Sequence, residues 1–403
     1  MYGKTGPGTV SYERAFFRRV ILSLLFFILI TTVISAEEFE LSSKSAILME
    51  YETGEILYKK EPDLELPPAS MSKIMTMLLV MEAIAEGKAK LDDKLVVSEY
   101  AASMGGSQIW LEPGEEMSLE DMMKAIAIVS ANDACVAVAE YLYGTEELFV
   151  KRMYERAREL GLKNTYFYNT NGLPPDNPDV QGNYSSAYDL AVMARELIKH
   201  RKVLEWTSTW QDYLRDGKSV LNNTNRLVRF YNGADGLKTG YTEEARYGVT
   251  ATAERNGVRF ISVVMGNDNS QDRFEEAGKL LSYGFGLFQG LKIASEGELV
   301  ETIKIPNGKE EEARALIENE LIIPVRRDRK DEVSKVIELD DRIKAPKKKG
   351  EKIGTMKIYR GNLLIKEVDI VIDRDVEKAS FFKIFARIIS YQINSITGLY
   401  QKD

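Results

Sequence analysis

The spacing of apolar residues predicts strands at both ends of the first 290 residues and helices between them. Residues 45–60 hold two strand-like runs around a Glu-Thr-Gly-Glu turn, which predicts a hairpin. Residues 237–253 and 258–266 are strand-like and are joined through Asn256-Gly257, a strong hairpin signal. The intervening residues have helical spacing interrupted by loops. We therefore expect an α/β (α+β) domain in which an antiparallel sheet, built from the two ends, carries a helical insertion.

The pattern changes after a predicted closing helix at residues 270–288. From about residue 291, short apolar runs separated by turn residues predict a small all-β domain. Residues 380–399 then place Phe381, Phe382 and Phe385 at helical spacing, with Lys383 and Arg387 between them. Such a basic amphipathic helix suits a membrane interface, and the alternative is a helix docked on the β domain.

The N-terminus has the features of a secretory signal. Three arginines precede an apolar run from Val20 to Ile34, and Ser35-Ala36 stands before Glu37. The run is short for a membrane span, which favours cleavage near Ala36 over an uncleaved anchor. We therefore expect the mature protein to work outside the cytoplasm, attached to the outer face of the membrane. The predicted regions are a signal peptide at 1–36, a catalytic domain at 37–290, a β-sandwich domain at 291–375 and an amphipathic helix at 376–403.

Composition excludes several classes of function. The formal net charge is −8, which argues against nucleic acid as a partner, since phosphate binding needs a basic face. Cys135 is the only cysteine and His200 the only histidine, so a disulfide and a multi-histidine or cysteine-rich metal site are excluded. Cys135 lies in an apolar helical stretch and is expected to be an inert buried thiol. His200 stands beside charged residues at a helix end, where a solvated bystander is expected. No cofactor or metal is predicted.

Three short motifs carry the candidate chemistry. They are Ser70-Met71-Ser72-Lys73, Ser130-Ala131-Asn132 and Lys238-Thr239-Gly240. Each is weak by itself, because Ser380 to Lys383 repeats the first pattern and Lys4 to Gly6 repeats the third. These copies fall in the tail helix and before the signal, where no pocket is expected.

Ser70 follows Pro68-Ala69 at a predicted helix start, so its N–H is among the unpaired donors of the first turn. Lys73 lies on the same face three residues later. A lysine amine accepts a serine proton only when it is neutral, and burial together with a second cation lowers its pKa. Lys238 is the candidate second cation. The alternative for this motif alone is a surface Ser and Lys.

Lys238 and Thr239 are expected on a strand that borders the pocket at the sheet edge, because their side chains point to opposite faces. Gly240 would let a helix or a substrate approach this strand closely. An extended peptide could then pair with the strand edge.

The three motifs, in this order, resemble the active-site set of penicillin-binding proteins and class A β-lactamases. The surrounding residues, including Asn132-Asp133-Ala134 and Asp235-Gly236-Leu237, are similar to low-molecular-mass D-alanyl-D-alanine carboxypeptidases. Residues 183–190 and 344–354 match that family too, so the resemblance covers the chain from about residue 40 to its end. It implies a β-lactamase/transpeptidase-like domain that removes the terminal D-alanine from peptidoglycan stem peptides and is inhibited by β-lactams.

The resemblance also implies roles for single residues. Ser70 would be the nucleophile, Lys73 its base, and Ser130 with Lys238 the proton donor to the leaving amine. Asn132 would bind the substrate peptide. Thr239 and Arg273 would hold the terminal carboxylate, with Arg246 as a fallback and a surface charge as the other interpretation of Arg273. The N–H groups of Ser70 and Tyr241 would form the oxyanion hole.

Three other functions share these residues. A class A β-lactamase would carry a glutamate about 35 residues after the second motif, and this chain has Asn164-Thr165-Tyr166-Phe167 there. An endopeptidase acting on cross-links would use the same site. A wall-binding scaffold with an inactive site would be expected to have lost one of the motif residues, and all of them are present.

Overall fold

The computed structural model describes residues 40–328 and 332–399, so the predicted signal peptide lies outside the described residues. The first domain is built on an antiparallel five-stranded sheet with the order β2-β1-β9-β8-β7. Both ends of the domain contribute to it, as the sequence predicts. Its strands are β1 (Ser45–Glu50), β2 (Ile56–Lys60), β7 (Ala234–Thr242), β8 (Arg246–Arg255) and β9 (Val258–Asn267).

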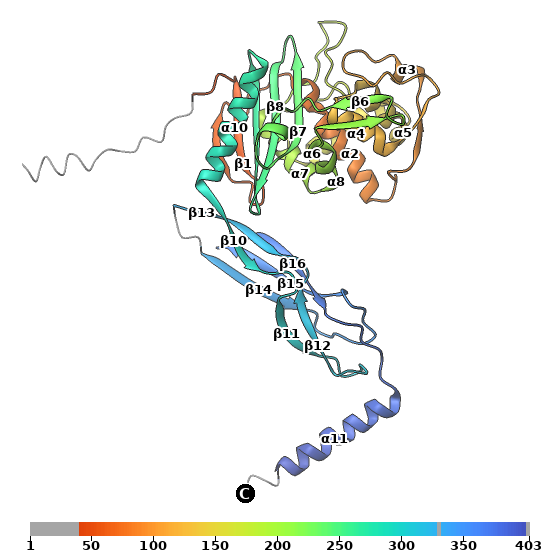
Figure 1. Cartoon of the computed structure of the whole chain (residues 1–403), viewed down its shortest axis with the longest axis vertical. Helices are drawn as coiled ribbons and strands as arrows, with labels where there is room; N and C mark the ends of the chain where they lie inside the picture. The colour runs from red at the N-terminus through yellow and green to blue at the C-terminus, as the bar shows by residue number, and fades with distance from the viewer. Residues whose placement is uncertain (1–39, 329–331, 400–403) are drawn as a thin grey trace, which may run out of the picture. The chain divides into compact units, whose positions relative to one another are not determined.

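Helices cover both faces of this sheet (Figure 1). The closing helix α10 (Ser270–Leu287) packs on one face, and the helical insertion lies on the other. The central strands β1 and β9 are buried along their whole length, so apolar residues stand on both of their faces, together with buried polar residues such as Arg259 and Ser262. Phe260 of β9 packs edge-to-face against Phe285 and Phe288 at 5.0 and 5.7 Å.

The insertion is organised around α2 (Lys73–Ala85), which is buried on nearly all sides because Ile, Met, Leu and Val surround its axis. Serine and threonine side chains cap several of its neighbours: Ser118, Thr145 and Ser186 each accept a hydrogen bond from a first-turn N–H. The remaining helices are η1 (Ala69–Ser72), α3 (Glu99–Ala102), α4 (Leu119–Ile128), α5 (Asn132–Tyr143), α6 (Glu146–Glu159), α7 (Ala187–Ile198), α8 (Lys202–Thr207) and α9 (Leu227–Phe230). Two hairpins complete the domain, β3 (Lys94–Val96) with β4 (Glu116–Ser118) and β5 (Gln211–Leu214) with β6 (Ser219–Asn222).

The structure corrects two details of the sequence interpretation. The run at 237–253 is not one strand but parts of β7 and β8, joined by a turn in which the Thr242 hydroxyl accepts from the Ala245 N–H. No Gly or Pro marks this turn, which is why the pattern missed it. Ser70 does not begin an α-helix directly. It lies in the 3₁₀ turn η1, and α2 starts at Lys73.

The C-terminal residues form an all-β domain, as predicted. One sheet has the order β11-β12-β16-β15-β14, and β10 pairs with β13. Alternate residues of β12 are buried, and Ile317, Ile323, Ile358 and Ile370 share one apolar core. The strands are β10 (Phe288–Ala294), β11 (Leu299–Lys304), β12 (Glu312–Ile317), β13 (Leu321–Arg326), β14 (Val333–Leu339), β15 (Lys352–Arg360) and β16 (Leu363–Ile372). Of these, β10, β12 and β16 were not identified from the sequence.

The last element is the predicted amphipathic helix, α11 (Phe381–Leu399). Phe381 and Phe382 are 76% and 81% exposed, whereas the Lys383 amine and the Arg387 guanidinium donate to the carbonyls of Lys309 and Gly308. The basic side of the helix therefore has polar partners and its first phenylalanines face outward. Within the described ranges, no helix combines the length and the apolar character needed to cross a membrane.

Replacing Phe260 by alanine should lower the free energy of unfolding by about 3–5 kcal/mol, because its ring fills the layer between the sheet and α10. Chemical denaturation followed by circular dichroism measures this loss. Tyr213→Ala removes an aromatic ring that is 52% exposed and should change stability by less than about 0.5 kcal/mol. Equal losses in the two variants would contradict the proposed packing.

Candidate active site

Two glycines allow the chain around Ser70 to be enclosed from both sides. Gly172 has a φ of +86°, and a Cβ there would lie 1.9 Å from the Ala69 carbonyl oxygen. A Cβ on Gly240 would lie 2.5 Å from the Pro68 carbonyl oxygen. The loop at Gly172 and the edge strand β7 thus approach η1 more closely than any side chain would permit. Ala69 itself has a φ of +48°, a strained conformation of the kind found at functional sites.

Lys73 is the centre of the site. It is fully buried, and its Nζ lies 2.8 Å from Ser70 Oγ, 2.7 Å from Asn132 Oδ1 and 2.8 Å from the Asn171 carbonyl oxygen. The first and second motifs therefore meet at one amine, together with a loop that no motif marks.

The hydrogen bonds of Lys73 fit a neutral amine. The Asn171 carbonyl and the Asn132 amide oxygen only accept, so they take the two N–H groups of the neutral form. In that form the remaining lone pair can accept from the Ser70 hydroxyl 2.8 Å away, whereas the charged form donates to the Ser70 oxygen. Burial lowers the pKa of Lys73 to about 8, which makes this neutral form accessible near neutral pH.

Lys238 lies close enough to interact with Lys73. It is 1% exposed, its Nζ donates to the Thr239 carbonyl at 3.1 Å, and its pKa is lowered well below the usual value by burial first and then by repulsion from Lys73. We expected this repulsion to contribute to the shift of Lys73, but burial is what lowers the pKa there. Because two positive charges at this separation repel each other, the state in which at least one of the two amines is neutral is favoured. A neutral amine can act as a base.

Ser130 follows α4 on a turn with a φ of +67°. It is 4% exposed, and its hydroxyl has no hydrogen-bond partner among the described residues. A buried hydroxyl without a partner is costly and is therefore a candidate for contact with a ligand.

Asn132 begins α5 and is oriented by a loop. Its Nδ2 donates to the Gly105 carbonyl at 2.7 Å, and its backbone N–H donates to the Ser107 carbonyl at 2.7 Å. The carboxylate of Asp133 accepts from the N–H groups of Ile109 and Leu111, which fixes the same loop. The amide of Asn132 is thus oriented with its oxygen toward Lys73.

Two family models match the chain in succession. The first, described as D-alanyl-D-alanine carboxypeptidase, matches residues 31–269. The second, described as Penicillin-binding protein 5, C-terminal domain, matches residues 288–378.

The chain belongs to the D-alanyl-D-alanine carboxypeptidase family.

Individual relatives agree with this assignment. D-alanyl-D-alanine carboxypeptidase DacF of Bacillus subtilis is 44% identical over 86% of this chain and 88% of its own length. The crystal structure of penicillin binding protein 5 from Haemophilus influenzae has a TM-score of 0.61 and 30% identity, covering 84% of this chain and 99% of its own. Penicillin-binding protein D2 from Listeria monocytogenes, solved with ampicillin bound, has a TM-score of 0.53 and 35% identity, covering 61% and 98%.

Membership in the D-alanyl-D-alanine carboxypeptidase family confirms the resemblance seen in the three motifs and the predicted fold class. It supports D-alanyl-D-alanine carboxypeptidase activity for the chain.

Arg273 contacts the third motif at Gly240. Arg273 of α10 is 8% exposed and donates to the Gly240 carbonyl at 3.1 Å. Its Nε has no partner in the described part of the chain, and burial lowers its pKa to about 10. A buried guanidinium bonded to neutral groups is suited to a carboxylate ligand. Arg246 is exposed, with its Nε 3.8 Å from Asp268, and the Tyr241 ring is 48% exposed and stacks on Tyr247.

Sequence reasoning missed residues that connect the motifs. Asn171 supplies the carbonyl that binds Lys73, and Asn183 donates its Nδ2 to Ser72 Oγ at 2.9 Å. The Oδ1 of Asn183 accepts from the N–H groups of Tyr168 and Asn169. The Asn171-Gly172 pair is typical of a loop, but nothing in the sequence indicates that this loop reaches Lys73.

His200 and Cys135, the single histidine and cysteine of the sequence, lie outside the three motifs. His200 follows the end of α7, and its backbone N–H donates to the Leu197 carbonyl. Cys135 lies fully buried in α5, where burial raises the pKa of its thiol to about 12, so it is an inert thiol at neutral pH.

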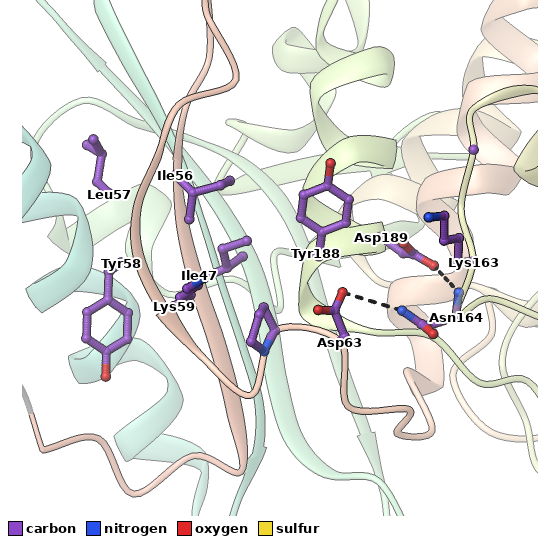
Figure 2. Close-up of a pocket in the computed structure, with 12 residues that line it drawn as sticks. Ile47, Ile56, Leu57, Tyr58, Lys59, Asp63, Lys163, Asn164, Tyr188 and Asp189 are labelled. Carbon is purple, nitrogen blue, oxygen red and sulfur yellow. Dashed lines mark hydrogen bonds between the residues drawn. The ribbon is translucent and has the colours of Figure 1, made fainter.

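A cavity of about 610 Å³ lies at the β2 edge of the sheet, opposite the β7 edge that carries the third motif (Figure 2). Asn164 lines this cavity, where its N–H donates to Asp189 and its Nδ2 lies 3.5 Å from Asp63 (Figure 2). The Thr165 hydroxyl also donates to Asp189. The segment at which a class A β-lactamase would place its glutamate is therefore bonded here to Asp189 in the first turn of α7.

The acylation of Ser70 should depend on pH through Lys73. The neutral amine is the active form, so the second-order rate constant for acylation by penicillin should rise about tenfold per pH unit below the pKa of about 8 and level off above it. Fluorescent penicillin labelling between about pH 6 and pH 9.5 measures this profile. Circular dichroism over the same range controls for unfolding, and a rate that falls between about pH 7 and pH 9 would rule out Lys73 as the base.

Proposed function

We propose that Ser70 is the nucleophile of a serine carboxypeptidase that releases the terminal D-alanine of peptidoglycan stem pentapeptides. The observation that supports this most directly is the buried Nζ of Lys73, which lies 2.8 Å from Ser70 Oγ and is also bonded to the oxygens of Asn132 and Asn171. A serine hydroxyl needs such a base to attack a peptide carbonyl.

In the proposed reaction, Ser70 Oγ attacks the carbonyl carbon of the penultimate D-alanine and its proton passes to Lys73. The N–H groups of Ser70 and Tyr241 would stabilise the oxyanion. As the C–N bond breaks, Ser130, with Lys238 beside the site, gives its proton to the amine of the terminal D-alanine and takes up the proton that Lys73 received from Ser70. Water then attacks the acyl-enzyme, restores Ser70 and releases the shortened peptide.

Substrate binding is proposed to use the unsatisfied groups of the site. Arg273 and Thr239 would bind the terminal carboxylate, and Asn132 the peptide. A carboxylate bound beside Thr239 favours the charged form of Lys238, and repulsion then helps to keep Lys73 neutral. Strand β7 is the edge strand of the sheet, so an extended peptide would pair along it, beside Gly240.

Penicillin is expected to acylate Ser70 and to leave slowly. The hydrogen-bond partners of Lys73 are a hydroxyl, an amide and a backbone carbonyl, so no carboxylate is bound to this amine to activate a deacylating water. Penicillin would then be an inhibitor, and β-lactamase activity is disfavoured. Endopeptidase action on cross-links would use the same residues and is a second outcome of substrate assays.

We further propose four regions for the chain: a signal peptide at 1–36, the catalytic domain at 37–290, a β-sandwich domain at 291–375 and a membrane-attaching helix at 376–403. The exposed Phe381, Phe382 and Phe385 of α11 support the last of these. The protein would then act outside the cytoplasm, on the outer face of the membrane.

The function is tested by release of D-alanine from a diacyl-L-Lys-D-Ala-D-Ala peptide. Ser70→Ala should abolish both D-alanine release and labelling by fluorescent penicillin, because no acyl-enzyme can form. His200→Ala is the matched control and should leave both unchanged. Rapid turnover of penicillin by the purified protein would favour a β-lactamase, and labelling without D-alanine release would indicate a different substrate.

Replacing Phe381 and Phe382 by serine should weaken binding to anionic lipid vesicles at least about tenfold, because two exposed rings are lost. Co-sedimentation of the full chain with vesicles measures this binding. Phe230→Ser removes a ring that is 69% exposed in the catalytic domain and should have no effect. Vesicle binding that is equal in the two variants would disprove membrane attachment through α11.

A further inference from the structure

The segment Asn223-Thr224-Asn225 crosses the site between the end of α8 and strand β7, and two buried asparagines hold it. The Nδ2 of Asn223 donates to the Thr207 and Thr209 carbonyls at 2.9 and 2.8 Å. The Nδ2 of Asn225 donates to the Gly236 carbonyl at 2.9 Å. The two asparagines are 6% and 1% exposed, so the backbone between them has little freedom.

Thr224, between them, contacts two walls of the site. Its N–H donates to the carbonyl of Ile128, the last residue of α4, two positions before Ser130. Its hydroxyl oxygen accepts from the Thr239 hydroxyl at 2.7 Å. Thr224 is half-buried, whereas Thr239 is 5% exposed. A ligand that reaches Thr239 therefore meets the Thr224 hydroxyl as well.

The hydroxyl protons of Thr224 and Thr239 determine what the pair can bind. Two hydroxyls have two protons, and the hydrogen bond between them uses one. The other O–H is left to donate to an external acceptor. Arg273 lies next to Thr239 in space, since its Nη1 donates to the Gly240 carbonyl, and it has neutral hydrogen-bond partners. An acceptor placed between the hydroxyl pair and this guanidinium is best stabilised when it carries a negative charge.

We propose that Thr224 is a specificity-determining residue that, paired with Thr239, selects substrates with a free terminal carboxylate. This rests on the proposed carboxypeptidase function and adds a residue to its carboxylate-binding end. In the complex, one hydroxyl of the pair donates to the carboxylate and the other fixes its direction. A substrate with a terminal carboxamide lacks the charge and presents N–H groups, so it gains less from the pair.

The test compares Thr224→Val, which keeps the shape and removes the hydroxyl, with Thr224→Ser, which keeps the hydroxyl. The substrates are diacyl-L-Lys-D-Ala-D-Ala with a free carboxylate and the same peptide with a terminal carboxamide. The readout is the ratio of the two kcat/KM values. We expect Thr224→Val to lower this preference for the carboxylate by about tenfold or more, and Thr224→Ser to retain most of it.

Acylation by benzylpenicillin and by its methyl ester provides a second readout that does not depend on peptide hydrolysis. The penicillin carboxylate should lose its advantage over the ester in Thr224→Val. A variant that keeps the wild-type preference in both assays would overturn the inference, as would equal losses for charged and uncharged ligands. A wild-type protein that acylates with penicillin but releases no D-alanine would refute the proposed function, while the penicillin comparison would still decide the role of Thr224.

Discussion

A buried lysine amine bonded to three oxygens is the interaction on which the rest of the site depends. The oxygens around Lys73 come from its own turn, from a residue 59 positions later and from one 98 positions later. The fold must therefore bring η1, the start of α5 and the Asn171 loop to one point. The burial of α2 on nearly all sides serves this requirement, since a central helix with its first residue in the site removes that amine from water.

The site gathers basic groups without matching acids. Lys73, Lys238 and Arg273 are all buried, and the hydrogen bonds described for them go to neutral oxygens. Burying charge without a partner is costly, and the pKa values of all three are accordingly lowered. The rest of the domain has to offset that cost. A single anionic group at the end of a substrate would complement what the protein leaves unsatisfied.

The sequence predicted the parts of the site that belong to motifs and left out the parts that belong to loops. Ser70 and Lys73 were recognisable because residues three positions apart on one helical turn share a face. Lys238 was recognisable because it was expected on an edge strand. Asn171 and Thr224 were not, since a carbonyl or a single hydroxyl has no spacing signature. The fold shows the same division. The hairpin at Asn256-Gly257 was found, while the turn at Glu243 to Ala245, which lacks Gly and Pro, was merged into one strand.

The Asn171 loop is held by buried residues, whereas the chain that follows it is mostly exposed. Gly172 and Asn183 are buried and bonded to Asn169, and Asn183 also holds Ser72, whereas residues 174–181 are mostly exposed. The exposed stretch is thus a surface loop whose two ends are held by hydrogen bonds near Ser70. Residues 174–181 supply none of the hydrogen bonds described for Lys73 and Asn132, so changes of length or composition there can alter this surface while the contacts that hold the base are kept.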